Sequence, residues 1–194
     1  MWKEPLLRFA REQGGEYIGQ PARWNEDVFV CLPGEPRLYI SMSEHMDALH
    51  NERSELWPTF RVAAVLECRN PITVKIRPAS LLRKGLGLLQ KPLQVGDPEV
   101  DGRYVITSPQ PQMARQLLGE LELRQQLAVG EPCSLQLTPV EEGASSCLIE
   151  VWSRRAPFTA EGRELVMEED YDPTHMEHMV ALCRAFWNAA DRWL

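Results

Sequence analysis

Apolar residues at helical spacing predict a helix at each end of the chain. Near the N-terminus, Trp2, Leu6 and Phe9 recur three or four residues apart. Near the C-terminus, a broad apolar stripe predicts a helix of about twenty residues. This stripe consists of Met176, Met179, Val180, Cys183, Phe186, Trp187, Ala190 and Leu194. Thr174, three residues before Glu177, fits the capping box with which such a helix begins.

Alternating apolar and polar residues predict strands between these helices. Residues 28–32 and 38–42 flank a turn rich in proline and glycine, and residues 133–137 and 147–151 flank a second turn, so each pair predicts a β-hairpin. The other predicted elements are strands over 60–68, 72–77, 103–108 and 165–167, helical structure over 112–127, and a loop or short surface helix over the polar stretch 43–57.

These elements predict an α+β fold. Strands that follow one another through short turns pair antiparallel, and helices that alternate with such strands pack as a layer on the sheet. We expect an antiparallel sheet of about six to eight strands, covered by the N-terminal helix, a central helical pair and the long C-terminal helix. No linker or repeat divides the 194 residues, so residues 1–194 are expected to form a single domain.

Composition and charge narrow the class of protein. The chain is 44% hydrophobic and 25% charged, which is typical of a globular protein. Its net charge of −7 argues against nucleic-acid binding. No stretch approaches the roughly 18 apolar residues of a membrane-spanning helix, so we expect a cytoplasmic protein that does not associate with membranes.

The cysteines are scattered and contain no Cys-x-x-Cys pair, which argues against a disulfide framework and a zinc site. They are expected to be reduced core residues; the five are Cys31, Cys68, Cys133, Cys147 and Cys183.

An acidic turn precedes the strand predicted at 103–108. Asp97, directly before Pro98, can accept backbone N–H groups and begin a helical turn. Asp101 can cap the end of this turn or pair with Arg103, and Val100 would then point inward. We therefore interpret Asp97, Pro98 and Asp101 as a structural turn rather than a pair of ligand-binding acids.

The order of this turn, a short strand and a helix resembles a family of uncharacterised bacterial domains with a Gly-Asp-x-x-Phe-Asp signature. The resemblance covers about residues 58–194 and includes Thr59-Phe60-Arg61 at the start of a strand. The chain differs from the family in Val100, where the family has Phe, in Gly102, and in the polar insert at 43–57. The resemblance implies a shared scaffold and brings no activity, cofactor or catalytic residue.

Two histidines near the start of the last helix are candidate metal ligands. His175 and His178 are spaced to share one helix face, and Asp172 and other acids precede them. The alternative is that they are exposed polar residues at a helix N-terminus. The sequence contains no metalloprotease, nucleophile-elbow or phosphate-binding motif, and no cofactor is expected. The chain is therefore interpreted as a non-enzyme in preference to an enzyme.

Two regions are candidate interaction surfaces. The basic, leucine-rich segment 81–91, with Arg83, Lys84 and Leu86, could dock on a partner or an anionic membrane, unless its leucines pack against the sheet. Trp187 and Trp193 extend the apolar character of the last helix beyond one stripe, which is typical of a helix that lies deep in the fold or contacts another chain, including a second copy.

The sequence favours a cytoplasmic, non-enzymatic interaction domain. Its ligand would be a protein partner, a second copy of the chain, or an apolar ligand under the C-terminal helix. The alternative is a metal-dependent or hydrolytic enzyme that uses the acidic and histidine-containing segment 168–178.

Overall fold

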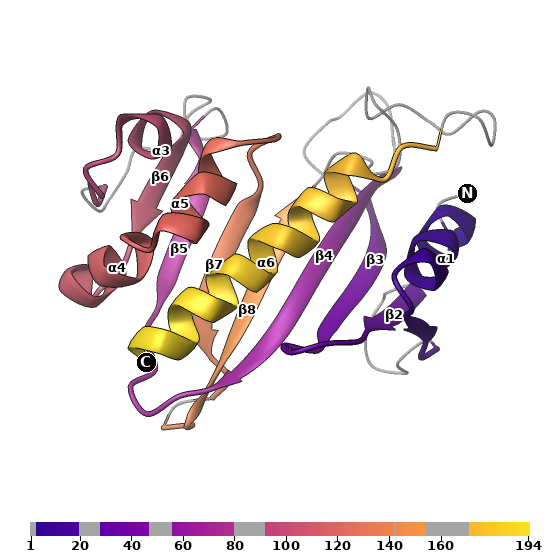
Figure 1. The fold of residues 1–194 in the computed structure, drawn as a ribbon, viewed down its shortest axis with the longest axis horizontal. Helices are drawn as coiled ribbons and strands as arrows, with labels where there is room; N and C mark the ends of the chain where they lie inside the picture. The colour runs from indigo at the N-terminus through magenta and orange to yellow at the C-terminus, as the bar shows by residue number, and fades with distance from the viewer. Residues whose placement is uncertain (1–2, 20–27, 47–55, 80–91, 142, 154–170) are drawn as a thin grey trace. The chain divides into compact units, whose positions relative to one another are not determined.

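The computed structural model describes residues 3–19, 28–46, 56–79, 92–141, 143–153 and 171–194. Within these ranges the chain forms one antiparallel eight-stranded sheet and five helices, which confirms the predicted α+β class (Figure 1). The helices are α1 (Lys3–Glu12), α3 (Pro98–Arg103), α4 (Pro111–Leu118), α5 (Leu121–Ala128) and α6 (Thr174–Trp193). The strands are β1 (Glu16–Tyr17), β2 (Val28–Leu32), β3 (Leu38–Met46), β4 (Leu56–Glu67), β5 (Val74–Pro78), β6 (Tyr104–Thr107), β7 (Ser134–Pro139) and β8 (Ser146–Ser153). None of the helices in the described part of the chain is long and apolar enough to cross a membrane.

The strand order in the sheet is β1-β2-β3-β4-β8-β7-β5-β6. Both predicted hairpins are present as neighbouring strands, and in the first of them Leu32 lies opposite Leu38. The second hairpin, β7 and β8, is inserted between β4 and β5, which are consecutive along the chain. The centre of the sheet therefore depends on pairing between strands that are distant in sequence.

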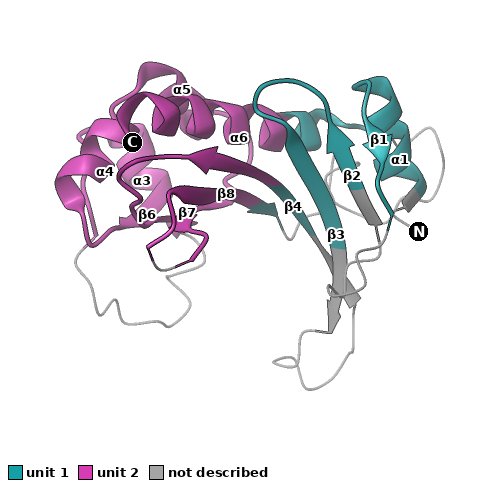
Figure 2. Ribbon diagram, turned by 90° about the horizontal axis from the view of Figure 1, so that it is seen from below, with its two compact units in different colours: residues 1–62, 152–177 teal, residues 63–151, 178–194 magenta. Residues whose placement is uncertain are grey.

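The described residues cluster into two compact units (Figure 2). Unit 1 comprises residues 1–62 and 152–177, and unit 2 comprises residues 63–151 and 178–194. The strands β4 and β8 and the helix α6 each contribute residues to both units. The expectation of a single domain stays a prediction.

In unit 1, Leu6 and Phe9 of α1 are buried, and two polar residues of this helix contact Tyr171, the first described residue of the C-terminal segment. The hydroxyl of Tyr171 donates to Glu12 Oε2 at 3.0 Å, and the Arg8 guanidinium lies 4.1 Å from the centre of the Tyr171 ring. Because Arg8 also pairs with Glu12 at 2.9 Å, these three side chains form a closed set of contacts.

In unit 2, the helices α3, α4 and α5 and the unit's part of α6 cover one face of the strands (Figure 2). The buried and exposed residues of β5 alternate, so Ile76 is buried while Lys75 and Arg77 are exposed, as the predicted basic outer face requires. The side chains of Cys183 and Phe186 on α6 have no exposed surface. Most of the predicted apolar stripe of the last helix is therefore core, while Trp187 and Leu194 are half-buried.

Two local predictions were wrong at positions that the structure describes. Residues 43–46 continue β3, and β4 begins at Leu56, so neither end of the polar stretch 43–57 is loop or helix, while residues 47–55 lie outside the described residues. Backbone pairing in a sheet can override the preference of a polar sequence. Thr174 does not cap α6 through Glu177, because Thr174 is itself the first residue of the helix and the Glu177 N–H donates to the Pro173 carbonyl at 2.9 Å. The Thr174 backbone N–H and hydroxyl instead both donate to Asp172 Oδ1. The predicted strand 165–167 and the basic segment 81–91 lie outside the described residues.

Candidate functional site

Both carboxylates of the acidic turn accept hydrogen bonds from backbone N–H groups. Asp97 Oδ1 accepts from the N–H groups of Glu99 at 3.0 Å and Val100 at 3.4 Å, which begins α3. Asp101 accepts from the backbone N–H groups of Val95 at 2.9 Å and Gly96 at 3.0 Å. Val100 is fully buried beneath the turn. The turn therefore stabilises the local backbone in the way that side-chain acceptors do in other turns and caps.

The last residue of α3 connects this turn to α5. The Arg103 guanidinium donates to the carbonyl oxygens of Ala128 and Gly130, at the C-terminal end of α5, rather than pairing with Asp101. A cation at this end of a helix stabilises the unpaired carbonyl groups and the negative end of the helix dipole. On the same helix, Arg124 lies 3.7 Å from Asp97. Both ends of α3 are thus joined to α5.

The two histidines near the start of α6 have different partners. His175 Nε2 lies 2.9 Å from the hydroxyl of Ser153 in unit 1. In unit 2, the His178 ring lies against Gly130, where an added Cβ would be 2.8 Å from His178 Cδ2. Asp172, the third predicted ligand, accepts the two bonds from Thr174. Among the described residues, no three His, Cys, Asp or Glu side chains come together as a metal site; residues 168–170 lie outside this set.

The environment of His178 favours its neutral form. Burial lowers the pKa of the ring below the usual value of 6.5, and the nearby Arg103 charge lowers it further. Its Nε2 has no hydrogen-bond partner among the described residues. His178 is therefore an uncharged packing group at neutral pH.

The distance between the Ser153 hydroxyl and His175 Nε2 lies within the range found for a nucleophile and its base. A histidine nitrogen within hydrogen-bond distance of a hydroxyl can accept its proton during attack on a carbonyl group. The Ser153 side chain is only 8% exposed, so access to the hydroxyl is narrow. This contact is the observation that favours a hydrolytic function.

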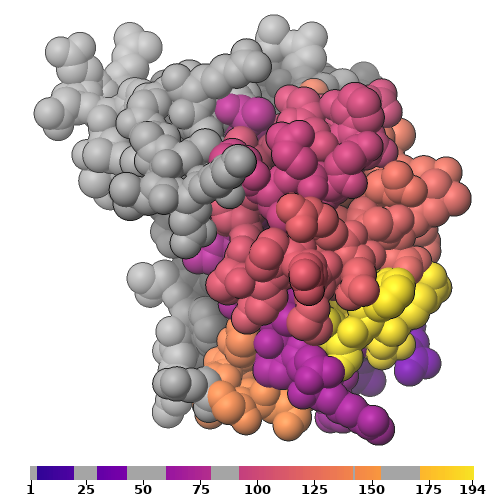
Figure 3. All heavy atoms as spheres, turned by 90° about the vertical axis from the view of Figure 1, so that its left-hand side faces the viewer, coloured from indigo at the N-terminus to yellow at the C-terminus, as the bar shows by residue number. Residues whose placement is uncertain are grey.

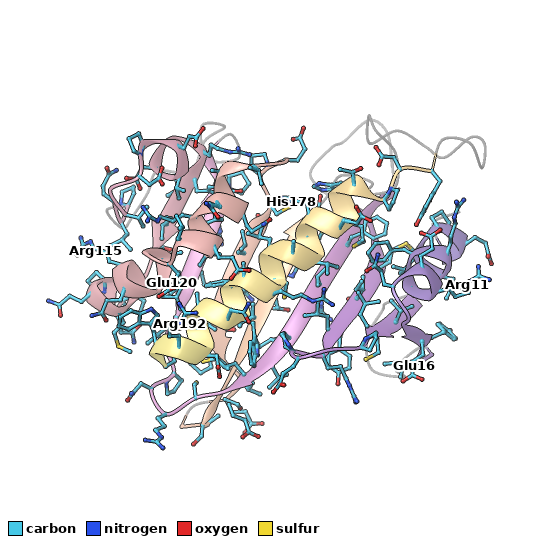
Figure 4. All side chains as sticks on the ribbon, viewed as in Figure 1. Arg11, Glu16, Arg115, Glu120, His178 and Arg192 are labelled. Carbon is cyan, nitrogen blue, oxygen red and sulfur yellow. The ribbon has the colours of Figure 1, made fainter. Side chains whose placement is uncertain are left out.

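The two tryptophans on α6 have different environments within unit 2. The Trp187 indole N–H donates to the backbone carbonyl of Val65 in β4 at 3.2 Å, so this side chain serves the packing of α6 on the strand. Trp193 is 44% exposed, and its indole N–H donates to Glu120 Oε1 at 2.6 Å. Glu120 also forms an ion pair with Arg192, and Figure 4 shows these two side chains side by side.

An exposed apolar side chain adjoins this arrangement. Leu121, directly after Glu120, is 62% exposed. Figure 3 shows the C-terminal end of α6 (yellow) at the surface of unit 2 beside the residues of α4 and α5. We call Glu120, Leu121, Arg192 and Trp193 the Trp193 corner. Arg83, Lys84 and Leu86, predicted to form another interaction surface, lie outside the described residues.

Sequence patterns identified Trp193 but missed Ser153, Glu120, Leu121 and Arg192. One signal was present in the sequence. Leu121 is not at helical spacing from Leu123 and Leu127, the buried residues of α5, so it lies on another face of that helix. No local signal pairs Ser153 with His175, or Glu120 with Trp193, because these contacts join distant parts of the chain.

Replacing Asp101 with Ala should lower the free energy of unfolding by about 1–2 kcal/mol, because two backbone N–H groups lose their acceptor. The matched control is Glu99→Ala, which removes an exposed acid from the same turn and should change stability by less than about 0.5 kcal/mol. Urea unfolding measures both changes. Equal effects of the two substitutions would contradict the assigned role of Asp101.

The lowered pKa of His178 predicts a loss of stability in acid. As the pH falls through 6.5, the usual histidine pKa, the unfolded chain is protonated at this histidine to a greater extent than the folded chain, so the stability contribution present at higher pH is lost as the pH falls. His178→Asn removes this contribution, and the stability difference between wild type and variant should narrow as the pH falls. Urea unfolding at several pH values tests this; a constant difference would contradict the assignment.

Comparison with known proteins shows a likeness in structure but none in sequence family. No family model matches the chain, and no curated protein matches it. Among solved structures, the chain is similar to the crystal structure of the mycobacterial trehalose monomycolate transport factor A, TtfA, with a TM-score of 0.54 and 10% sequence identity. The similarity covers 96% of this chain and 92% of that chain. At this identity the likeness shows the fold alone.

Proposed function

We propose that this chain is a non-enzymatic, cytoplasmic interaction domain that binds a protein partner at the Trp193 corner. The observation that carries the proposal is the Trp193 indole, which is 44% exposed although its N–H is hydrogen-bonded to Glu120. A side chain that is held in place before binding loses little conformational entropy when a partner covers it. Tryptophan and arginine are also the residues that most often dominate the energy of protein interfaces.

The corner suits a partner that inserts an apolar side chain beside a hydrogen-bond acceptor. Trp193 and Leu121 supply the exposed apolar surface. The Arg192 side chain is 64% exposed, and its guanidinium has more donors than its pairing with Glu120 uses. Two apolar side chains are fewer than an interface of about 800 Å² per partner requires, so the corner would be the anchor of a larger contact.

We favour a different protein over a second copy of this chain. Each copy has a net charge of −7, and like net charges oppose self-association. The likeness to TtfA, whose name describes a transport factor, is compatible with a protein that acts through others; this extension rests on analogy between folds.

A photoreactive phenylalanine derivative at position 121 should crosslink to another protein in the cells that produce the chain. The same derivative at position 129 is the matched control, because Val129 is also exposed, at 52%, and lies at the other end of α5. Adding Trp193→Ala to the position-121 variant should reduce the adduct by about tenfold, since loss of an anchoring tryptophan weakens binding strongly. The adducts are measured by gel electrophoresis and mass spectrometry.

Two outcomes would contradict this proposal. Equal adducts from positions 121 and 129 would show that the corner has no special role. An adduct that contains two copies of the chain, together with a dimer in analytical ultracentrifugation that Trp193→Ala dissociates, would replace the partner with self-association. Urea unfolding of Trp193→Ala serves as the control for folding.

A hydrolytic enzyme is the second candidate, favoured by the 2.9 Å contact between Ser153 and His175. A fluorophosphonate probe, which reacts with serine nucleophiles, tests it directly. The interaction proposal predicts no labelling of the native protein. Labelling at Ser153 that is lost in Ser153→Ala and in His175→Ala would instead establish a reactive pair and favour the enzyme.

A further inference from the structure

Two cysteine side chains meet within unit 2. Cys68 Sγ lies 3.4 Å from Cys147 Sγ, and both residues are buried. Cys68 follows β4 directly, and its backbone N–H donates to the carbonyl of Ser145, next to the start of β8, at 3.0 Å. Since β4 and β8 are neighbours in the sheet, the backbone holds the two thiols at this separation.

We infer that Cys68 and Cys147 form a site of reversible disulfide formation. A disulfide has an S–S distance of about 2.05 Å, so the two sulfur atoms need to approach by only about 1.4 Å. Rotation of the two side chains about their Cα–Cβ bonds would supply such a movement. The inference is independent of the proposed binding at the Trp193 corner.

The oxidant would be a small-molecule disulfide of the glutathione class. The Cys68 thiolate attacks one of its sulfur atoms, which forms a mixed disulfide on Cys68 and releases one small thiol. The Cys147 sulfur then loses its proton and attacks Cys68 Sγ, which forms the protein disulfide and releases the second small thiol. Two protein thiols are oxidised, one small disulfide is reduced to two thiols, and no further reactant is needed.

The order of attack follows from the two environments. Cys68 is the more accessible side chain, at 7% exposed against 0% for Cys147. Burial and the contact with Cys68 raise the pKa of Cys147 to about 12, which disfavours its thiolate. Cys68 is therefore the attacking residue and Cys147 the resolving residue.

The experiment treats the reduced full-length protein with oxidised glutathione under native conditions. Proteolysis without reductant followed by mass spectrometry should identify a peptide that links Cys68 to Cys147, and dithiothreitol should remove it. The bond joins positions 79 apart in sequence, so we expect it to raise the midpoint of thermal unfolding by several degrees.

Variants test the order of attack. Cys147→Ser should accumulate glutathione on Cys68, whereas Cys68→Ser should leave Cys147 unmodified. Cys133→Ser is the matched control, because Cys133 is buried and its sulfur contacts a backbone carbonyl rather than a thiol; the linked peptide should form as in the wild type.

Three results would overturn the inference. One is the absence of the linked peptide in the wild-type protein under oxidation. Another is its formation only in denaturant. The third is a linked protein with a lower unfolding midpoint, since this would mean that the bond requires a distorted fold. The search for the linked peptide in the wild-type protein tests the inference even where a variant fails to fold.

Discussion

Unit 2 depends on burial of the inner face of α6. Leu182, Cys183 and Phe186 are fully buried on this face, and a large apolar side chain contributes about 1.5–3 kcal/mol when it leaves water. The Trp187 indole bonded to β4 adds a directional contact, which sets the rotation of the helix. The carbonyl of Leu194 accepts from two backbone N–H groups just after β4, so the end of the helix is also held.

The acidic turn and the Trp193 corner belong to one continuous set of contacts. Asp97 and Asp101 fix the start and the approach of α3, and Arg103 at its end binds the last carbonyl groups of α5. Glu120 directly precedes the first residue of α5 and holds the Trp193 side chain. The acidic turn and the Trp193 corner are therefore both connected to α5, the turn through Arg124 and the carbonyl groups at its C-terminal end and the corner through Glu120 at its N-terminal end.

Contacts that are local in sequence were predictable, and distant ones were not. Helical spacing and alternation predicted α6 and both hairpins, because each pattern lies within one element or one pair. The insertion of β7 and β8 between β4 and β5 has no local signal, since the alternation within one strand does not specify which distant strand lies beside it. The same limit applied to the candidate sites. Spacing placed His175 and His178 near one another on a helix, but their different partners, Ser153 and Gly130, come from separate elements.

The close approach of His178 to Gly130 also constrains how the sequence can change. Position 130 has a φ of +63°, which glycine tolerates best, and any larger residue there would collide with the imidazole. A residue with a side chain at position 130 would therefore require a smaller residue at position 178 and a different backbone conformation of the turn. In an alignment of related chains, the two positions should covary, and this covariation would report a contact between a loop and a helix that are 48 residues apart by their numbering.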